Sequence, residues 1–134
     1  MKTLLFAMIM VNSLFTPAGD VKVAVTPETL ELRNGSHAVF DIRLEAGEGI
    51  HVNTRPAITV ESQTKGVELS IREVPKSGEY LDLGRPIEVQ CKASGLTQGA
   101  HRVDFIVGFT YCNDNEGWCR LGRASSSIEI RVSK

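Results

Sequence analysis

The chain has 134 residues, of which 42% are hydrophobic, 23% charged and 6% aromatic, and its formal net charge is -1. This composition is typical of one globular domain and excludes an intrinsically disordered chain. The charge is nearly balanced, without the basic surplus of nucleic-acid-binding domains. We therefore expect no nucleic-acid partner.

Residues 1–18 form a candidate secretory signal peptide. Lys2 supplies a positive charge at the start, and an apolar run follows over residues 4–15. The small residues that end the segment predict cleavage after Ala18. The run is short for a membrane span, and an uncleaved anchor is the alternative. We expect an exported mature domain, residues 19–134, in an oxidising compartment where disulfides persist.

Apolar residues alternate with polar residues along five segments, with the period of a half-buried β-strand. These predicted strands have their apolar faces within residues 40–44, 67–71, 87–91, 103–111 and 128–132. Shorter candidates are residues 21–25, 50–53 and 57–61. The pair Asn34-Gly35 is a strong signal for a two-residue hairpin turn. Seven or eight short strands in one chain predict an all-β, antiparallel β-sandwich.

The long connection over residues 74–84 carries Tyr80 and Leu81, which we expect to be exposed. A loop of this length on a sandwich is a candidate functional element. The alternative is a plain surface connection in which Tyr80 folds onto the edge of the core.

Three cysteines, Cys91, Cys112 and Cys119, allow three single disulfide pairings. Cys91 is in phase with the inward face of its strand, which favours a buried and inert thiol. A polar, acidic loop with one glycine separates Cys112 from Cys119, so their pairing needs no assumption about distant packing and is the default. Pairing Cys91 with one of the other two is the competing hypothesis and would give a buried structural link.

A disulfide between Cys112 and Cys119 closes a ring of about eight residues, worth about 2.5 kcal/mol in the loop-entropy model. That is a weak staple for a whole domain, so a short and accessible disulfide suits redox exchange better than structural support. Asp114 and Glu116 lie between the cysteines and disfavour a thiolate. We therefore expect no strongly acidic nucleophile, although a partner's thiolate can still attack the disulfide.

Other kinds of site are less well supported. The histidines, His37, His51 and His101, are scattered, and the cysteine pair lacks the spacing of zinc ligands, so we expect no metal. No phosphate-binding loop or acyl-transfer motif accompanies the cysteines, and we expect no cofactor. Asn34-Gly35-Ser36 matches a glycosylation acceptor, but a hairpin turn explains these residues more simply.

Three sequence features carry a resemblance to a known family. A predicted strand ends in Phe109-Thr110-Tyr111-Cys112, and a short loop ends in Gly117-Trp118-Cys119. The third feature, Gly49-Ile50-His51-Val52-Asn53, lies near the start of the matching region. Together they resemble the periplasmic N-terminal domain of the thiol–disulfide interchange protein DsbD. The resemblance covers roughly residues 47–132.

The resemblance implies an immunoglobulin-like fold in which Cys112 and Cys119 cycle between dithiol and disulfide. It implies that electrons pass from a membrane-embedded donor to thioredoxin-like proteins in the periplasm. The family shields its cysteines with an aromatic cap loop, for which residues 74–84 with Tyr80 are the candidate. Tyr111 and Trp118 are candidates for docking a partner, and the alternative for Trp118 is a core anchor beside the disulfide. We expect a monomer, and which cysteine attacks stays open.

Some features depart from the family. The loop between the cysteines is one residue longer, Arg120-Leu121 replaces a proline-containing stretch, and Cys91 is additional. The chain ends just after its last predicted strand, so we expect any electron donor to act in trans. The alternative function is a non-catalytic, immunoglobulin-like binding module with a structural disulfide. A third hypothesis is a family member that binds a redox partner without turnover.

Overall fold

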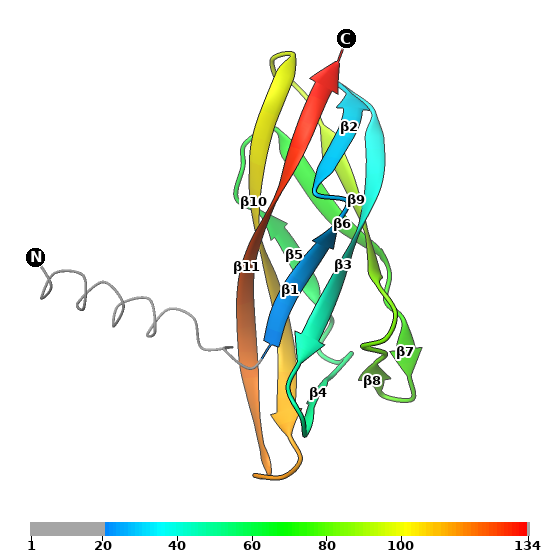
Figure 1. Ribbon diagram of the computed structural model, residues 1–134, viewed down its shortest axis with the longest axis vertical. Helices are drawn as coiled ribbons and strands as arrows, with labels where there is room; N and C mark the ends of the chain where they lie inside the picture. The colour runs from blue at the N-terminus through cyan, green and yellow to red at the C-terminus, as the bar shows by residue number, and fades with distance from the viewer. Residues whose placement is uncertain (1–20, 134) are drawn as a thin grey trace, which may run out of the picture.

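Alternating apolar residues build two β-sheets that pack face to face in the computed structural model, which describes residues 21–133 (Figure 1). The candidate signal peptide, residues 1–18, lies outside the described residues. The first sheet has the order β1 (Val21–Thr26), β3 (His37–Ala46), β9 (Ile87–Ala93), β6 (Val67–Glu73). The second has the order β2 (Thr29–Arg33), β11 (Trp118–Ser133), β10 (Gly99–Asn113), β4 (Ile50–Val52), and β5 (Thr59–Ser62) also pairs with β10.

The core lies between the two sheets and is filled by the predicted inward faces. Phe40 and Val89 are buried on the first sheet, and Phe105, Val107 and Ile130 are buried on the second. The strong period-two segments are all strands, so the predicted all-β, immunoglobulin-like sandwich is confirmed. One strand pair departs from the antiparallel expectation, because β2 runs parallel to β11.

The turn at Asn34-Gly35 is not a hairpin turn, which corrects the prediction. It connects β2 with β3, and these two strands belong to different sheets. The Asn34 side chain instead accepts a hydrogen bond from the backbone N of Leu96 at 3.1 Å, and the Gly35 N donates to the Ala93 carbonyl at 2.8 Å. Gly35 has a φ of 80°, which the turn requires. The turn therefore carries the chain between sheets and fastens it to the loop after β9.

The longest element is the hairpin of β10 and β11, which runs most of the length of the molecule (Figure 1). Its register continues from the pair Gly99↔Val132 to the pair Asn113↔Trp118. Sequence periodicity predicted only residues 128–132 of β11, because most of residues 118–127 are small, polar or charged and the segment does not alternate clearly. The hairpin brings its turn to the end of the sandwich where β4 lies.

A second, much smaller hairpin lies near the same end. It consists of β7 (Lys76–Ser77) and β8 (Tyr80–Leu81), which pair antiparallel. An isolated bridge between Tyr80 and Asn53 joins it to the residue after β4. The predicted connection over residues 74–84 is therefore ordered and attached to the second sheet beside the cysteines.

Candidate functional site

The register of the second sheet places Cys119, Cys112 and His51 in one row across three neighbouring strands. Cys112 on β10 pairs with Cys119 on β11 and with His51 on β4. Their neighbours Tyr111 and Val52 point into the core, so alternation directs the row to the opposite face of the sheet. The site is thus built by cross-strand pairing at one end of the sandwich.

The structure contains a disulfide between Cys112 and Cys119, which confirms the default pairing. The two Cα atoms are 4.0 Å apart, and both cysteines lie within strands. The disulfide is therefore a cross-strand link. Of the six residues that were expected to form a loop between the cysteines, Asn113 ends β10, Trp118 begins β11 and the other four form a tight turn.

The turn of the long hairpin is organised by Asn113. Its Oδ1 accepts hydrogen bonds from the backbone N of Asn115 and of Glu116, both at 2.9 Å. Gly117, with a φ of 74°, donates its N–H to the Asn113 carbonyl at 2.8 Å. These hydrogen bonds stabilise the turn in which the chain reverses direction. They bring Cys119 back opposite Cys112.

The two sulfur-bearing residues differ in exposure. Cys112 is buried, with 6% of its surface accessible, whereas Cys119 is exposed. A second protein can therefore reach Cys119 more readily than Cys112. This asymmetry was not predictable from the sequence, in which each cysteine follows an aromatic residue.

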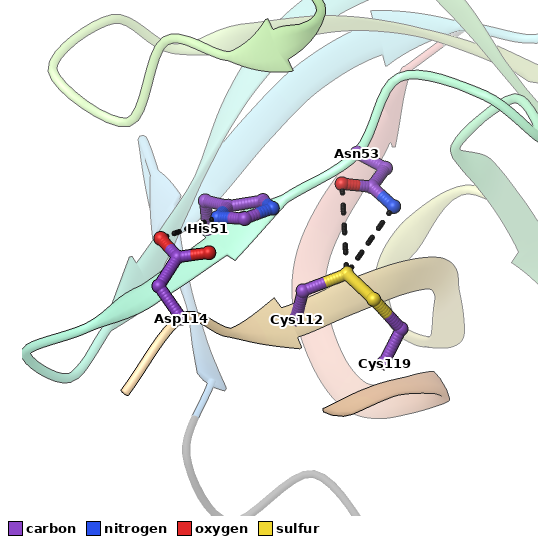
Figure 2. The surroundings of a disulfide bond; sticks show 5 residues. All are labelled: His51, Asn53, Cys112, Asp114 and Cys119. Atoms are coloured by element: carbon purple, nitrogen blue, oxygen red, sulfur yellow. Dashed lines mark hydrogen bonds and ion pairs between the residues drawn. A yellow bond between two sulfur atoms is a disulfide. The ribbon is translucent and has the colours of Figure 1, made fainter. Parts of the chain in front are cut away.

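Asn53 reaches the buried sulfur from the end of β4 (Figure 2). Its Nδ2 lies 3.6 Å from the Sγ of Cys112, and its Oδ1 lies 4.0 Å from the same atom. Asn53 belongs to the stretch that carried the resemblance, and no role was predicted for it from the sequence. Its contact depends on the register between β4 and β10, which a single sequence does not disclose.

His51 connects the hairpin turn with the small β7–β8 hairpin. Its Nδ1 lies 2.9 Å from the Oδ2 of Asp114, as Figure 2 shows. Its ring stacks on Tyr80, with 3.9 Å between the ring centroids. From the sequence, Asp114 was identified only as an acidic residue between the cysteines. In the structure its carboxylate contacts His51.

Part of the segment over residues 74–84 lines the pocket that also contains both cysteines. Tyr80 is 42% exposed and its ring contacts His51. The role of this segment as a cap stays a prediction. Leu81 is buried, with 5% exposure, so the expectation that it is exposed was wrong. Alternation along β8 explains the difference, because it turns Leu81 into the core when Tyr80 faces outward.

Trp118 and Tyr111, the two candidate docking residues, occupy different depths. Trp118 is partly buried, and its Nε1 donates a hydrogen bond to the Glu116 carboxylate at 3.1 Å. The Arg120 guanidinium lies 4.0 Å from the centroid of the Trp118 ring. Tyr111 is fully buried and meets Trp118 edge to face, with centroids 5.5 Å apart. Tyr111 therefore supports the site from the core, which differs from the docking contact that we expected.

An open pocket of about 690 Å³ surrounds the disulfide. Both cysteines line it, together with Asn53, Tyr80 and Trp118. Leu121 is 76% exposed and lies two residues after Cys119, on the same face of β11. From the sequence it was noted only as a departure from the family. An apolar side chain beside a reachable sulfur is a further candidate for partner contact.

Cys91 takes no part in this site. It is fully buried in the core and free, as its inward phase on β9 predicted. Burial removes water from the thiol and raises its pKa from 9.0 to about 11. Because Cys112 and Cys119 are bonded to each other, Cys91 pairs with neither of them in this structure.

Among residues 21–133, no cluster of three or more histidine, cysteine or acidic side chains could hold a metal ion. Within the same described part of the chain, no helix has the length and apolar character needed to cross a membrane.

Comparisons with known proteins address the fold alone. Murine CRIg aligns with a TM-score of 0.46 and 12% identity, covering 87% of this chain and 100% of its own. The BIgI domain of beta protein from S. agalactiae, in a structure bound to CEACAM1, aligns with a TM-score of 0.41 and 12% identity, covering 85% and 97%. No protein-family model and no curated protein matches the sequence. These comparisons give no support to the resemblance to DsbD.

Proposed function

We propose that this domain exchanges thiols and disulfides with partner proteins through Cys112 and Cys119. The observation that carries the proposal is the asymmetric disulfide, with an exposed Cys119 and a buried Cys112 in one open pocket. Exchange needs one sulfur that a partner can approach in line and another that can leave. Cys119 fits the first role, and Cys112 fits the second.

The domain accepts electrons in two steps. A thiolate of a reduced dithiol partner attacks the Sγ of Cys119, so the bond between Cys119 and Cys112 breaks and its electron pair moves to Cys112. The partner's second thiolate then attacks the partner sulfur in this mixed disulfide and releases Cys119. The partner leaves with a disulfide, two electrons poorer, and the domain holds the dithiol.

The domain passes electrons on by the reverse sequence. The Cys119 thiolate attacks the disulfide of an oxidised partner and forms a mixed disulfide. Cys112 then attacks the Sγ of Cys119 and releases the reduced partner. Following the resemblance to DsbD, the proposed setting is the periplasm, with thioredoxin-like partners and a membrane-embedded donor acting in trans.

The assignment of Cys119 as the attacking residue is tested by comparing Cys112→Ser with Cys119→Ser, both in a Cys91→Ala background. The probe is a thioredoxin-like protein with one active-site cysteine, activated with thionitrobenzoate. Because Cys119 is the exposed cysteine, we expect Cys112→Ser to release thionitrobenzoate at least about tenfold faster than Cys119→Ser. Equal rates, or a faster Cys119→Ser, would contradict the assignment.

A second candidate function is a non-catalytic binding module with a structural disulfide. The fold and the single disulfide fit this function without any further chemistry, and the cysteines lie directly opposite each other across β10 and β11. In that case Leu121 and Trp118 would contact a ligand, and the disulfide would hold the hairpin together. This candidate predicts a disulfide that reduced thioredoxin-like proteins do not open.

A further inference from the structure

The backbone holds the Asn53 side chain against the disulfide. The Asn53 N–H donates to the Thr110 carbonyl at 2.8 Å, and its bridge to Tyr80 fixes it from the other side. Asn53 lies two residues after His51, so both side chains occupy the same face of β4 and its extension. The amide therefore approaches Cys112 from a position that two backbone pairings determine.

The amide presents both of its polar atoms to the Sγ of Cys112, as Figure 2 shows. A disulfide sulfur and a thiolate have no hydrogen, so they can only accept a hydrogen bond, and Nδ2 can donate it. A thiol has a hydrogen, which Oδ1 can accept. Asn53 thus offers a hydrogen bond to this sulfur in each of its chemical states.

We propose that Asn53 stabilises the Cys112 thiolate when Cys119 is attacked, an inference that rests on the proposed exchange function. As the attacking thiolate bonds to Cys119, the electron pair of the broken bond collects on the Cys112 Sγ, 3.6 Å from the Asn53 Nδ2. A hydrogen bond to a charged acceptor is stronger than one to a neutral acceptor, so the contact gains strength as the thiolate forms. Asn53 thereby assists departure from a sulfur that is largely removed from water.

The carboxylate nearest in sequence contacts another side chain and not Cys112. Asp114 is held by His51 at 2.9 Å, and it is exposed. Glu116 accepts hydrogen bonds from Trp118 at 3.1 Å and from Asn113 at 2.9 Å. Both acidic groups of the turn thus have partners of their own, while the group contacting Cys112 is a neutral amide.

The test titrates Cys112 alone, in a Cys91→Ala and Cys119→Ser background, by the ultraviolet absorbance of the thiolate. Asn53→Ala removes the N–H donor, and Asn53→Asp replaces it with a carboxylate of nearly the same shape. We expect Asn53→Ala to lower the thiolate population at a fixed pH by about tenfold, the usual effect of one hydrogen bond to a charge. Asn53→Asp should lower it further, because an ionised carboxylate repels the thiolate.

Asn115→Asp is the matched control. It makes the same charge change in the hairpin turn, where the Asn115 amide lies against Gly49. We expect it to change the pKa of Cys112 less than Asn53→Asp does. In the native disulfide, Asn53→Ala should also slow reduction by dithiothreitol. An unchanged Cys112 titration in folded Asn53→Asp, or equal shifts in Asn53→Asp and Asn115→Asp, would overturn the proposal.

The titration needs no redox partner, so the two proposals can fail separately. A lowered thiolate population in the Asn53 variants without any partner exchange supports the hydrogen bond and overturns the proposed function. Exchange with an unchanged Cys112 titration overturns the role of Asn53 and leaves the proposed function standing.

Discussion

At the scale of single residues, surroundings set the chemistry of each cysteine. Cys91 is enclosed by the core and has a pKa raised by burial. Cys112 is covered but contacts the Asn53 amide, and Cys119 is exposed on the neighbouring strand. Since nucleophilic attack requires an approach path, exposure distinguishes the two cysteines of the disulfide, each of which follows an aromatic residue in the sequence.

The raised pKa of Cys91 makes stability depend on pH. Between the ordinary value of 9.0 and about 11, the folded state keeps a proton that the unfolded chain releases. The free energy of unfolding therefore falls as the pH rises through this range, and this thiol has no such effect below it. We expect urea denaturation at several pH values to show a fall that is smaller in Cys91→Ala. Identical pH dependence in both proteins would contradict the raised pKa.

At the scale of elements, the β10–β11 hairpin positions the site and depends on close packing at Gly122. A Cβ atom there would lie 2.5 Å from the Phe109 Cε2 and 3.0 Å from the Tyr111 Cδ1. Both rings are buried, so neither can move aside freely. The absence of a side chain at Gly122 thus leaves room for the aromatic residues that support Trp118 and the disulfide.

We expect Gly122→Ala to lower the free energy of unfolding by about 1–3 kcal/mol, the usual cost of overpacking a core. Leu121→Ala is the matched control on the adjacent position. Because Leu121 is 76% exposed, its change should stay within about 0.5 kcal/mol. Urea denaturation measures both. A Gly122→Ala protein as stable as the native one would show that the rings accommodate a methyl group.

Strands could be predicted from the sequence where one face is buried and the other is exposed, because apolar and polar residues then alternate. Examples are Phe40 and Ile42, and residues 103–111. The pairing of a strand with its neighbours could not be predicted. The residues Asn34-Gly35 can form a turn between two strands of one sheet or between strands of different sheets, as they do here. The cysteine pair was found from spacing alone. Asn53 and Asp114 were not assigned their contacts, since these depend on the cross-strand register of β4 with β10.

At the scale of the whole molecule, the site lies at one end of the sandwich, on the outer face of the second sheet (Figure 1). The core that holds the sheets together lies between them and includes Phe40, Phe105 and Ile130. Chemistry at the disulfide is therefore separated from the packing that stabilises the fold. A change of redox state should leave the sandwich intact.

We accordingly expect Cys119→Ser to remain folded while losing exchange. The loss of a ring of about eight residues should cost about 2.5 kcal/mol or less, and circular dichroism should retain the β-sheet signal. An unfolded Cys119→Ser protein would show that the disulfide supports the fold, as the binding-module hypothesis requires.

The reduction potential of the Cys112–Cys119 pair, measured on residues 19–134, tests the central claim most directly. Equilibration with glutathione buffers, followed by thiol alkylation and mass analysis, gives the fraction reduced and identifies the bonded cysteines. The exchange function predicts a potential well above about -300 mV, within the range of labile disulfides. A potential below about -300 mV would mark the disulfide as structural and contradict the proposed function.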